Sequence, residues 1–324
     1  MRLLDARGLR AALGDVHALV RAMRGVFLEV AAGGFHLPLR TRARPPGESA
    51  NGMTMMPTLR LDGPRRWALK EMVVTPGNPA RGLDPLQGVV VLHDGDDGRV
   101  LAIADAPQLT TLRTAATTAL ATLTFARPDA QTIAILGTGA QGRAHIAALQ
   151  AVVPNARLRL WGRTPARTAA LAGEFGCVPC AGIEEAVRGA DIVCTVTAAA
   201  DPILQAGWIA PGCHITAVGS STPAACEIDP PLMAAARLFV DRRDAALSES
   251  GDVRRALAAG AIGEQHIVAE LGEVLAGRHA GRASSEEITL YKALGFGALD
   301  LAALELALAV AEERNLGTVV EWGA

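Results

Sequence analysis

Three glycines within residues 132–145, TIAILGTGAQGRAH, have the spacing of a nucleotide-binding loop. Gly137, Gly139 and Gly142 form a G-x-G-x-x-G pattern that follows an apolar run and opens an alanine-rich helical segment. In such a loop the first glycine allows a tight turn, the second lets a pyrophosphate approach the backbone, and the third lets the helix pack against the strand. The free N–H groups at the start of the helix bind the anion. Because strand, loop and helix follow in this order, the pattern predicts a dinucleotide site rather than a plain glycine turn.

The residues after the next predicted strand distinguish the two nicotinamide dinucleotides. An acidic residue there binds the ribose 2′-hydroxyl of NAD, whereas an arginine accommodates the 2′-phosphate of NADP. The sequence reads LRLWGRTPARTAAL, with no Asp or Glu between Arg157 and Ala172, and with Arg163 and Arg167 after the strand. We therefore expect NADP(H) to be favoured and NAD(H) to be possible. The expected cofactor-binding residues are Gly137, Thr138, Gly139, Ala140, Gln141, Gly142, Arg163, Thr164, Thr197, Val218 and Gly219.

The elements around this loop predict an α/β fold with a Rossmann doubly wound parallel sheet. A long helical pattern over residues 107–126 precedes it. Short apolar runs then alternate with helical patterns, as in parallel α/β sheets. The runs expected to be strands are 131–137, 157–163, 177–181, 191–197, 213–219 and 237–241. Residues 252–316 predict a return to helices, the last of which covers 298–315.

The first hundred or so residues predict a separate α+β lobe. A helical pattern over residues 9–33 is followed by RTRARPPGESANG, which is typical of an irregular loop or hairpin. Antiparallel strands are expected at 67–74, 87–94 and 99–105, because Asp and Gly in DGDDG favour a hairpin turn between the last two. A terminal helix often packs back on the first lobe. We therefore expect a discontinuous domain, 1–112 with 299–324, around a Rossmann domain, 113–298.

Composition excludes several classes of protein. The 324 residues suffice for two domains, and a formal net charge of −2 without basic clusters argues against a nucleic-acid partner. No apolar run is long enough to predict a membrane span, and the N-terminus does not resemble a signal peptide. Five cysteines predict free thiols in a reducing compartment, so we expect a cytoplasmic protein. Cys177 and Cys180 are interpreted as small packed residues, and the histidines lack ligand spacing, so no metal is expected.

Longer segments resemble the ornithine cyclodeaminase/mu-crystallin family over essentially the whole chain. The segment ending in Arg113-Thr114-Ala115-Ala116 is the most specific, because no general dinucleotide fold requires it. The resemblance implies a Rossmann lobe, a substrate-binding lobe that forms a homodimer, and an imino- or amino-acid substrate. The segments that carry it are PLRT (38–41), MMP (55–57), LKEMVVTPGNPARGL (69–83), 88–122, ILGTGAQGRAH (135–145), 190–204, VGSSTP (218–223) and EITLYKALGFGALDLAAL (287–304).

The resemblance carries three cationic positions over as substrate-binding residues. Arg40 matches the arginine that holds the substrate carboxylate, Lys70 the lysine beside it, and Arg113 the arginine of the R-T-A-A helix. A guanidinium pairs bidentately with a carboxylate, and a second cation orients it. Each residue also has a plainer interpretation as an exposed loop, strand or helix cation. Lys70 lies between apolar residues and is expected to point inward, whereas Arg42 is an alternative to Arg40.

The sequence departs from ornithine cyclodeaminases in VGSSTPAACEID. Those enzymes have an aspartate, which acts as base and amine anchor, where this chain has Ser221, and a lysine where it has Ala225. Glu227 and Asp229 are interpreted as charges at the start of a helix. An amine substrate needs a base before hydride transfer, whereas a preformed imine does not. The departure therefore favours imine reduction.

We accordingly expect an NAD(P)H-dependent reductase of a small cyclic ketimine carboxylate, with delta-1-pyrroline-2-carboxylate giving L-proline as the leading substrate. Lys70, Arg113 and Ser221 are the expected catalytic residues. The alternatives are an ornithine cyclodeaminase, an alanine-type amino-acid dehydrogenase and a non-enzymatic binding protein like mu-crystallin.

Overall fold

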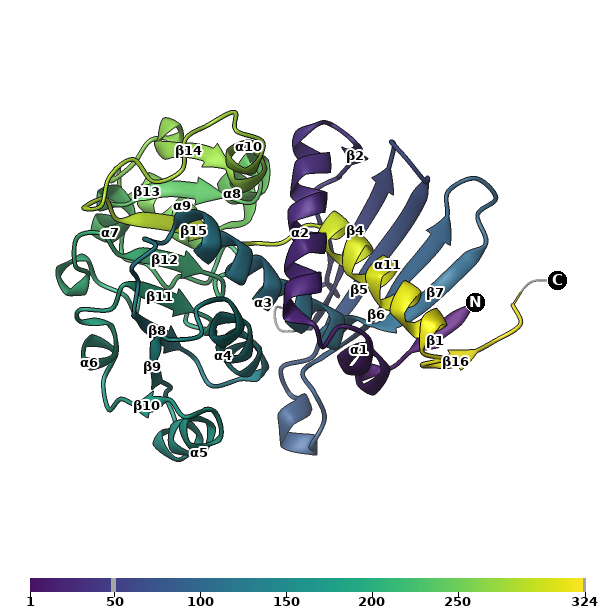
Figure 1. Cartoon of the computed structure of the whole chain (residues 1–324), viewed down its shortest axis with the longest axis horizontal. Helices are drawn as coiled ribbons and strands as arrows, with labels where there is room; N and C mark the ends of the chain where they lie inside the picture. Colours follow the sequence, from purple (N-terminus) through teal and green to yellow (C-terminus); the bar gives the residue numbers. More distant parts are fainter. Residues whose placement is uncertain (48–50, 323–324) are drawn as a thin grey trace. The chain divides into compact units, whose positions relative to one another are not determined.

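The computed structural model describes residues 1–47 and 51–322, and it divides the chain into two compact units (Figure 1). Unit 1 comprises residues 1–114 and 295–324, and unit 2 comprises residues 115–294. The expected bounds were 1–112 with 299–324 and 113–298. The long helix α3 (Ala106–Phe125) begins in unit 1 and ends in unit 2, and the last helix, α11 (Gly297–Glu313), returns to unit 1.

Unit 1 contains a mixed sheet in the order β16-β1-β7-β6-β5-β4-β2, with β3 paired to β4. Strands β4 to β7 form an antiparallel meander, and β1 is parallel to β7. The strand bounds are β1 (Arg2–Leu4), β2 (Phe35–His36), β3 (Thr41–Ala43), β4 (Gly52–Arg60), β5 (Arg66–Val74), β6 (Leu86–Asp94), β7 (Val100–Asp105) and β16 (Thr318–Val319). The three predicted strands correspond to β5, β6 and β7, and the DGDDG turn joins the last two.

The two faces of this sheet differ because side chains alternate along each strand. On the inner face Met56, Lys70, Val90, Ala104 and Leu4 lie opposite one another across five strands, and all are buried. Helix α11 covers this face against β4, β5 and β6, and it also packs against α1 (Ala6–Ala12) and α2 (Val16–Ala31) (Figure 1). A short 3-10 helix, η1 (Asn78–Arg81), connects β5 and β6.

Unit 2 contains an eight-stranded parallel sheet in the order β10-β9-β8-β11-β12-β15-β13-β14. The prediction of a doubly wound parallel sheet is confirmed. Its order reverses between β8 and β11, and such a switch point is where nucleotides bind in open α/β sheets. The bounds are β8 (Thr132–Leu136), β9 (Arg157–Trp161), β10 (Val178–Pro179), β11 (Ile192–Thr195), β12 (His214–Ala217), β13 (Arg237–Val240), β14 (Ile267–Glu270) and β15 (Thr289–Lys292).

Helices on both faces of this sheet enclose two apolar cores. Ala134 and Leu136 of β8 face one core, and Ile133 and Ile135 face the other. The remaining helices are α4 (Ala140–Val152), α5 (Pro165–Phe175), α6 (Ile183–Val187), η2 (Ala206–Trp208), α7 (Pro230–Ala235), α8 (Arg243–Glu249), α9 (Gly251–Ala258), η3 (Glu264–His266) and α10 (Leu271–Leu275).

Three predicted features of the fold were wrong or incomplete. The tail 252–316 is not purely helical, because β14 and β15 lie within it and β15 is inserted between β12 and β13. The helical pattern of residues 9–33 is divided, since Asp15 caps α2 after α1 has ended. The strand β4 was not predicted. Part of the expected loop or hairpin before it, residues 48–50, lies outside the described residues.

Candidate active site

The glycine loop of unit 2 has the geometry that a pyrophosphate requires. Gly137 has a φ of 131°, which a residue with a side chain rarely adopts, and a Cβ on Gly142 would overlap the Gly137 carbonyl oxygen. Gly139 begins α4 without a side-chain cap, and nothing lies within 4 Å of where its Cβ would be. The start of the helix therefore offers open backbone N–H groups to an anion. Thr138, Ala140 and Gln141 complete this turn, so the described residues fit a dinucleotide here.

Arg163 lies just beyond the carboxyl end of β9, the strand next to this loop. The Gly137 N–H donates to the Trp161 carbonyl at 2.8 Å, which brings the end of β9 to the glycine turn. Arg163 and Thr164 are exposed at the start of α5, and Thr164 caps that helix without a side-chain hydrogen bond. Within residues 1–47 and 51–322 the Arg163 side chain has no hydrogen-bond or ion-pair partner. An exposed guanidinium thus lies at the end of the second strand, which is where dinucleotide-binding folds contact the ribose 2′-hydroxyl or 2′-phosphate.

Glu227 is not a helix-start charge, contrary to its predicted role. It is completely buried, and its carboxylate accepts five hydrogen bonds at the carboxyl ends of two neighbouring strands. Asp229, two residues later, does cap α7 through the Leu232 N–H. The five donors to Glu227 are Thr197 N and Thr197 Oγ1 (both 2.7 Å), Thr195 Oγ1 and Gly219 N (both 2.8 Å), and Ser220 N (3.3 Å).

These contacts join the loops that follow β11 and β12. Both loops carry predicted cofactor-binding residues, namely Thr197 in the first and Val218 and Gly219 in the second. Burial raises the pKa of Glu227, and the Lys292 charge and the Thr197 hydrogen bonds act in the opposite direction. An ionised carboxylate has about four lone-pair directions for acceptance. Five donors occupy them, so the role of Glu227 is to hold backbone rather than to take a proton from a substrate.

A buried ion pair, Lys292 with Asp252, holds the backbone at Glu227. Both side chains are fully buried, and Lys292 Nζ lies 3.0 Å from Asp252 Oδ2. The Lys292 ammonium also donates to the Ala217 carbonyl at 3.2 Å. The other Asp252 oxygen accepts the backbone N–H groups of Glu227 at 2.6 Å and Ile228 at 3.0 Å. Burial disfavours the Asp252 carboxylate, but the Lys292 charge together with the hydrogen bonds from Lys292 and from the Glu227 and Ile228 N–H groups outweighs burial, and the pKa is lowered. The pair therefore anchors the segment that carries Glu227.

Ser221 lies in the loop that Glu227 holds. It is half-buried, and its N–H donates to the Gly219 carbonyl at 3.1 Å. The Glu227 carboxylate reaches this loop, and its oxygens are already bonded as described above. Position 221 itself therefore carries a hydroxyl where ornithine cyclodeaminases have the aspartate.

Unit 1 gathers the cations that the family resemblance singled out. Lys70 on β5 and Arg113 on α3 are each 4% exposed, and both contact Asp300 on α11. The Lys70 ammonium lies 2.7 Å from Asp300 Oδ2, and Arg113 Nε lies 3.0 Å from Asp300 Oδ1. Lys70 therefore points inward, as its sequence neighbours predict. Burial and the charges of Arg113 and Arg40 lower its pKa to about 8, although Asp300 acts in the opposite direction.

Arg40 is a loop arginine that the structure ties to this cluster, whereas Arg42 lies on β3. Its guanidinium donates to the Gly295 carbonyl at 3.0 Å. Gly295 has a φ of 74°, and a Cβ there would overlap the Arg113 guanidinium. The LGFG segment thus needs a glycine at 295 both for its turn and for the approach of Arg113. Arg40, Lys70 and Arg113 come from three separate elements and meet beside the start of α11.

The histidine and cysteine side chains were not expected to bind a ligand. His145 is buried between Thr118 and the Gln141 carbonyl, and burial lowers its pKa to about 4, so the ring is neutral. All five cysteines are free and buried. No group of metal-binding side chains occurs among the described residues, and no described helix could cross a membrane.

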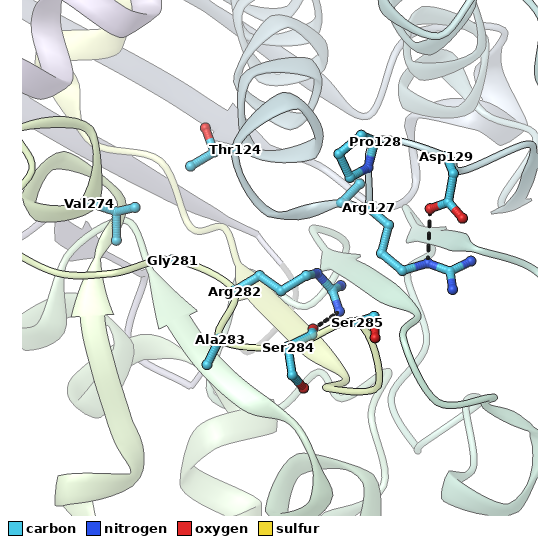
Figure 2. Close-up of a pocket in the computed structure, with 11 residues that line it drawn as sticks. Thr124, Arg127, Pro128, Asp129, Val274, Gly281, Arg282, Ala283, Ser284 and Ser285 are labelled. Carbon is cyan, nitrogen blue, oxygen red and sulfur yellow. Dashed lines mark hydrogen bonds and ion pairs between the residues drawn. The ribbon is translucent and has the colours of Figure 1, made fainter.

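A pocket of about 490 Å³ lies at the amino ends of the unit 2 strands, which is the end opposite the glycine loop, and Figure 2 shows the side chains that line it. Its two arginines bind other groups of the protein. Arg127 binds Asp191 at 2.6 Å, and Arg282 donates to the Phe125 carbonyl and to Thr289 Oγ1 at 2.8 and 2.9 Å. Both cations of the pocket are therefore paired with groups of the protein.

Asp300 and Glu227 are the functional residues that sequence reasoning missed. Each left a weak signal. Asp300 is one of two carboxylates within the apolar segment 297–311, and Glu227 stands between Cys226 and Ile228, which are both buried. A charged residue in an apolar stretch is rarely buried without a partner. That rule could have marked both residues, although it does not name the partners.

Comparisons with known proteins agree with this architecture. The model of the ornithine cyclodeaminase/mu-crystallin family matches residues 12–315. The chain belongs to that family. It is 42% identical over 222 residues to the ketimine reductase mu-crystallin of Mus musculus, which covers 68% of each chain.

Two solved structures share the fold over nearly all of both chains. The delta(1)-pyrroline-2-carboxylate reductase of Thermococcus litoralis, in complex with NADH and L-proline, has a TM-score of 0.89 and 29% identity over 99% of this chain and 100% of that one. An archaeal alanine dehydrogenase dimer with bound NAD has a TM-score of 0.92 and 26% identity over 100% of this chain and 99% of that one. This family member is an oxidoreductase with a nicotinamide-binding domain.

Proposed function

We propose that the protein is an NADPH-dependent reductase that converts a small cyclic ketimine carboxylate, with delta-1-pyrroline-2-carboxylate as the leading candidate, to the saturated amino acid, here L-proline. The observation that carries the proposal is the buried pair of cations in unit 1, Lys70 and Arg113, held on one carboxylate. The ketimine reductase and the pyrroline-2-carboxylate reductase described above support the same chemistry at a carbon–nitrogen double bond.

The cations give the substrate carboxylate a defined place. Arg113 and Arg40 supply planar guanidinium groups that bind a carboxylate through paired hydrogen bonds, and Lys70 adds a compact charge beside them. Burial strengthens these interactions, because a charge is poorly screened away from water. Bound nicotinamide supplies the hydride. The residues of this chain orient the substrate and keep its carboxylate paired.

Ser221 favours reduction over cyclodeamination. Oxidation of ornithine begins with an amine that must lose a proton to a base. Position 221 carries a hydroxyl, and the Glu227 carboxylate of the same loop is saturated with hydrogen bonds. A cyclic imine already has the oxidation state that accepts a hydride. It requires only a proton, which we assign to Lys70 or to a water bound by the Ser221 hydroxyl.

The choice of cofactor rests on Arg163. The two solved relatives hold NADH and NAD, so a nicotinamide dinucleotide suits the fold. In this chain an exposed guanidinium stands at the end of β9, and no acidic residue occurs between Arg157 and Ala172. An arginine at this position accommodates the 2′-phosphate of NADP, whereas an acidic residue would bind the free 2′-hydroxyl of NAD. We therefore assign NADPH as the preferred reductant and NADH as a weaker one.

The outer face of the unit 1 sheet supports a homodimer. Pro57, Leu69, Val91, Ile103 and Leu3 form an apolar row across five strands on that face. Nearby on β5, Trp67 is 50% exposed and Val73 is 37% exposed. Contiguous apolar surface of this kind is typical of an interface. We assign a second copy of this chain as the partner of this face.

The cysteines support a location in the cytoplasm. All five are free thiols, which suits a reducing compartment.

One assay tests the proposed activity. The purified protein is given NADPH or NADH together with delta-1-pyrroline-2-carboxylate, delta-1-piperideine-2-carboxylate, or pyruvate plus ammonia, and the loss of NAD(P)H absorbance is followed. Ornithine with the oxidised cofactor is tested for ammonia release. We expect oxidation of NADPH with a cyclic imine and no ammonia from ornithine. Turnover confined to pyruvate plus ammonia would assign an alanine-type dehydrogenase instead, and no turnover with any substrate would favour a binding protein.

A further inference from the structure

Asp300 lies at the meeting point of three elements in unit 1. Its carboxylate is 1% exposed, and each oxygen faces a different cation: Oδ2 binds Lys70 on β5, and Oδ1 binds Arg113 on α3. The two cations lie 230 and 187 residues away in the sequence. One carboxylate on α11 thus sets the positions of two long side chains that come from other parts of the unit.

The start of α11 is shaped for this contact. The chain turns at Gly295 with a positive φ, and the missing side chain there leaves room for the Arg113 guanidinium. Arg40 donates to the carbonyl of the same residue. Asp300 then lies in the first turn of the helix, where a negative charge is favoured by the helix dipole. The backbone and the carboxylate together bring all three cations to one place.

We propose that Asp300 is a positioning residue for the reaction: it orients the Lys70 ammonium and the Arg113 guanidinium so that both meet the substrate carboxylate. This inference rests on the proposed function. A free lysine or arginine side chain has many rotamers, and this conformational freedom must be lost before the side chain can hold a ligand. Asp300 removes that freedom in advance, and in this way it raises affinity for the substrate without contacting it.

The charges around Lys70 explain why one carboxylate has a large effect. In the sheet Lys70 lies between Met56 of β4 and Val90 of β6, which carry no charge. From α3 it faces Arg113 and the Thr110 hydroxyl at 3.5 Å, from the loop before β3 it faces Arg40, and from α11 it faces Asp300. Asp300 is thus the negative group that keeps this buried ammonium charged beside two other cations.

The pH dependence follows from these contacts. The Lys70 pKa is lowered to about 8, so the charged form dominates below pH 8 and is lost as the pH rises through that value. Burial alone would raise the pKa of Asp300, but Arg113 and Lys70 outweigh it and hold the pKa below its ordinary value, so Asp300 stays ionised throughout this range. Removing its charge lowers the Lys70 pKa further, because an opposite charge at this distance favours the ammonium.

The test compares Asp300→Asn with Glu305→Gln in the full-length protein. Glu305 is a matched control, because it lies on the same helix and pairs with Arg60 on β4 at 2.7 Å. kcat/KM with delta-1-pyrroline-2-carboxylate is measured from pH 5.5 to 9.5. We expect the wild type and Glu305→Gln to lose activity above about pH 8. In Asp300→Asn we expect KM to rise about tenfold or more, and the alkaline limb to move to lower pH by about one unit. Cofactor affinity should not change.

Asp300→Glu separates positioning from folding. It keeps the negative charge but displaces it by one methylene. We therefore expect KM to rise while the alkaline limb stays near pH 8. This variant tests the inference even if Asp300→Asn does not fold. An unchanged KM in Asp300→Glu, or an Asp300→Asn profile that matches the wild type, would overturn the inference. If the wild type reduces no imine at all, the proposed function fails instead. The Lys70 titration is then followed by ¹⁵N NMR in wild type and variants, where equal pKa values in both would overturn the role of Asp300.

Discussion

Asp300 in unit 1 and Glu227 in unit 2 are both buried carboxylates, but they act on different kinds of partner. Asp300 binds the charged ends of two flexible side chains, Lys70 and Arg113. Glu227 binds three backbone N–H groups and two threonine hydroxyls in the loops after β11 and β12. The first arrangement positions two cationic side chains, and the second positions the backbone of two loops.

Their pKa directions reflect this difference. Burial raises the pKa of both groups, but in Asp300 the charges of Arg113 and Lys70 outweigh burial and the pKa is lowered. In Glu227 burial prevails over the Lys292 charge and the neutral hydrogen-bond donors, and the pKa is raised. Two cations in direct contact thus stabilise a buried carboxylate more than five largely neutral donors do. Substitutions that act on one unit and spare the other can test this division of roles.

The largest effect is expected from the cations that Asp300 holds. Lys70→Ala and Arg113→Ala should each lower kcat/KM for the imine by about 10²–10³-fold, because truncating one partner of a buried charge pair costs roughly 2–5 kcal/mol. NADPH affinity, measured by fluorescence titration, should stay within about twofold, since neither residue belongs to the glycine loop. Lys70→Met controls for packing between Met56 and Val90 and should be as inactive as Lys70→Ala. Near wild-type efficiency in either alanine variant would remove that residue from the site.

Arg163→Ala tests unit 2 on its own. Loss of a charge-assisted phosphate contact costs about 1.5–3 kcal/mol, so the Kd for NADPH should rise roughly ten- to a hundredfold. The Kd for NADH should change little, because NADH has no 2′-phosphate. Arg167→Ala, one turn further along α5, is the matched control. Equal losses for both cofactors, or a wild-type preference for NADH, would contradict the assignment of NADPH.

A smaller effect on cofactor binding is expected from Glu227→Gln. The amide NH2 would replace one of the two carboxylate oxygens and would therefore face either the Thr197 N–H or the Gly219 N–H, which can only donate. Such a mismatch costs about 1–3 kcal/mol. We expect Kd to rise about tenfold for NADPH and NADH alike, together with a lower midpoint of thermal unfolding. Asp229→Ala removes the cap of α7 two residues away and serves as control, with reduced stability but unchanged Kd. Glu227→Gln with wild-type cofactor affinity would limit Glu227 to a role in folding.

Local patterns explain which parts of the site could be predicted. The glycine loop was recognisable because strand, turn and helix are contiguous in sequence, and Arg163 follows at a known interval. Lys70 could be expected to point inward because apolar residues surround it in the strand. The Rossmann sheet was also predictable from its alternating runs, although β15 was not. A four-residue segment such as TLYK, which mixes apolar and polar residues, does not show by itself whether it is strand or helix.

The partners of the buried charges could not be predicted, because nothing local encodes them. Asp300 meets Lys70 only after the chain has formed the whole of unit 2 and returned to unit 1. Glu227 and Asp229 were both assigned to a helix start because they follow Pro223, and that assignment was correct for Asp229 alone. The family resemblance indicated Arg40, Lys70 and Arg113 but not the carboxylate that joins two of them.

The smallest effect is expected at Ser221, and it separates the two leading enzymatic functions. Ser221 shares its loop with Gly219, which Glu227 holds, so a polar replacement should leave the loop in place. Ser221→Asp should keep imine reduction within about tenfold of the wild type, since reduction of a preformed imine does not depend on a base at this position. The wild type should release no ammonia from ornithine, because a serine hydroxyl is too weak a base to deprotonate an amine. Ser221→Ala, which removes the hydroxyl without adding charge, is the control for proton supply. Proline and ammonia formed from ornithine by the unmodified protein would contradict the reductase assignment, whatever the variants do.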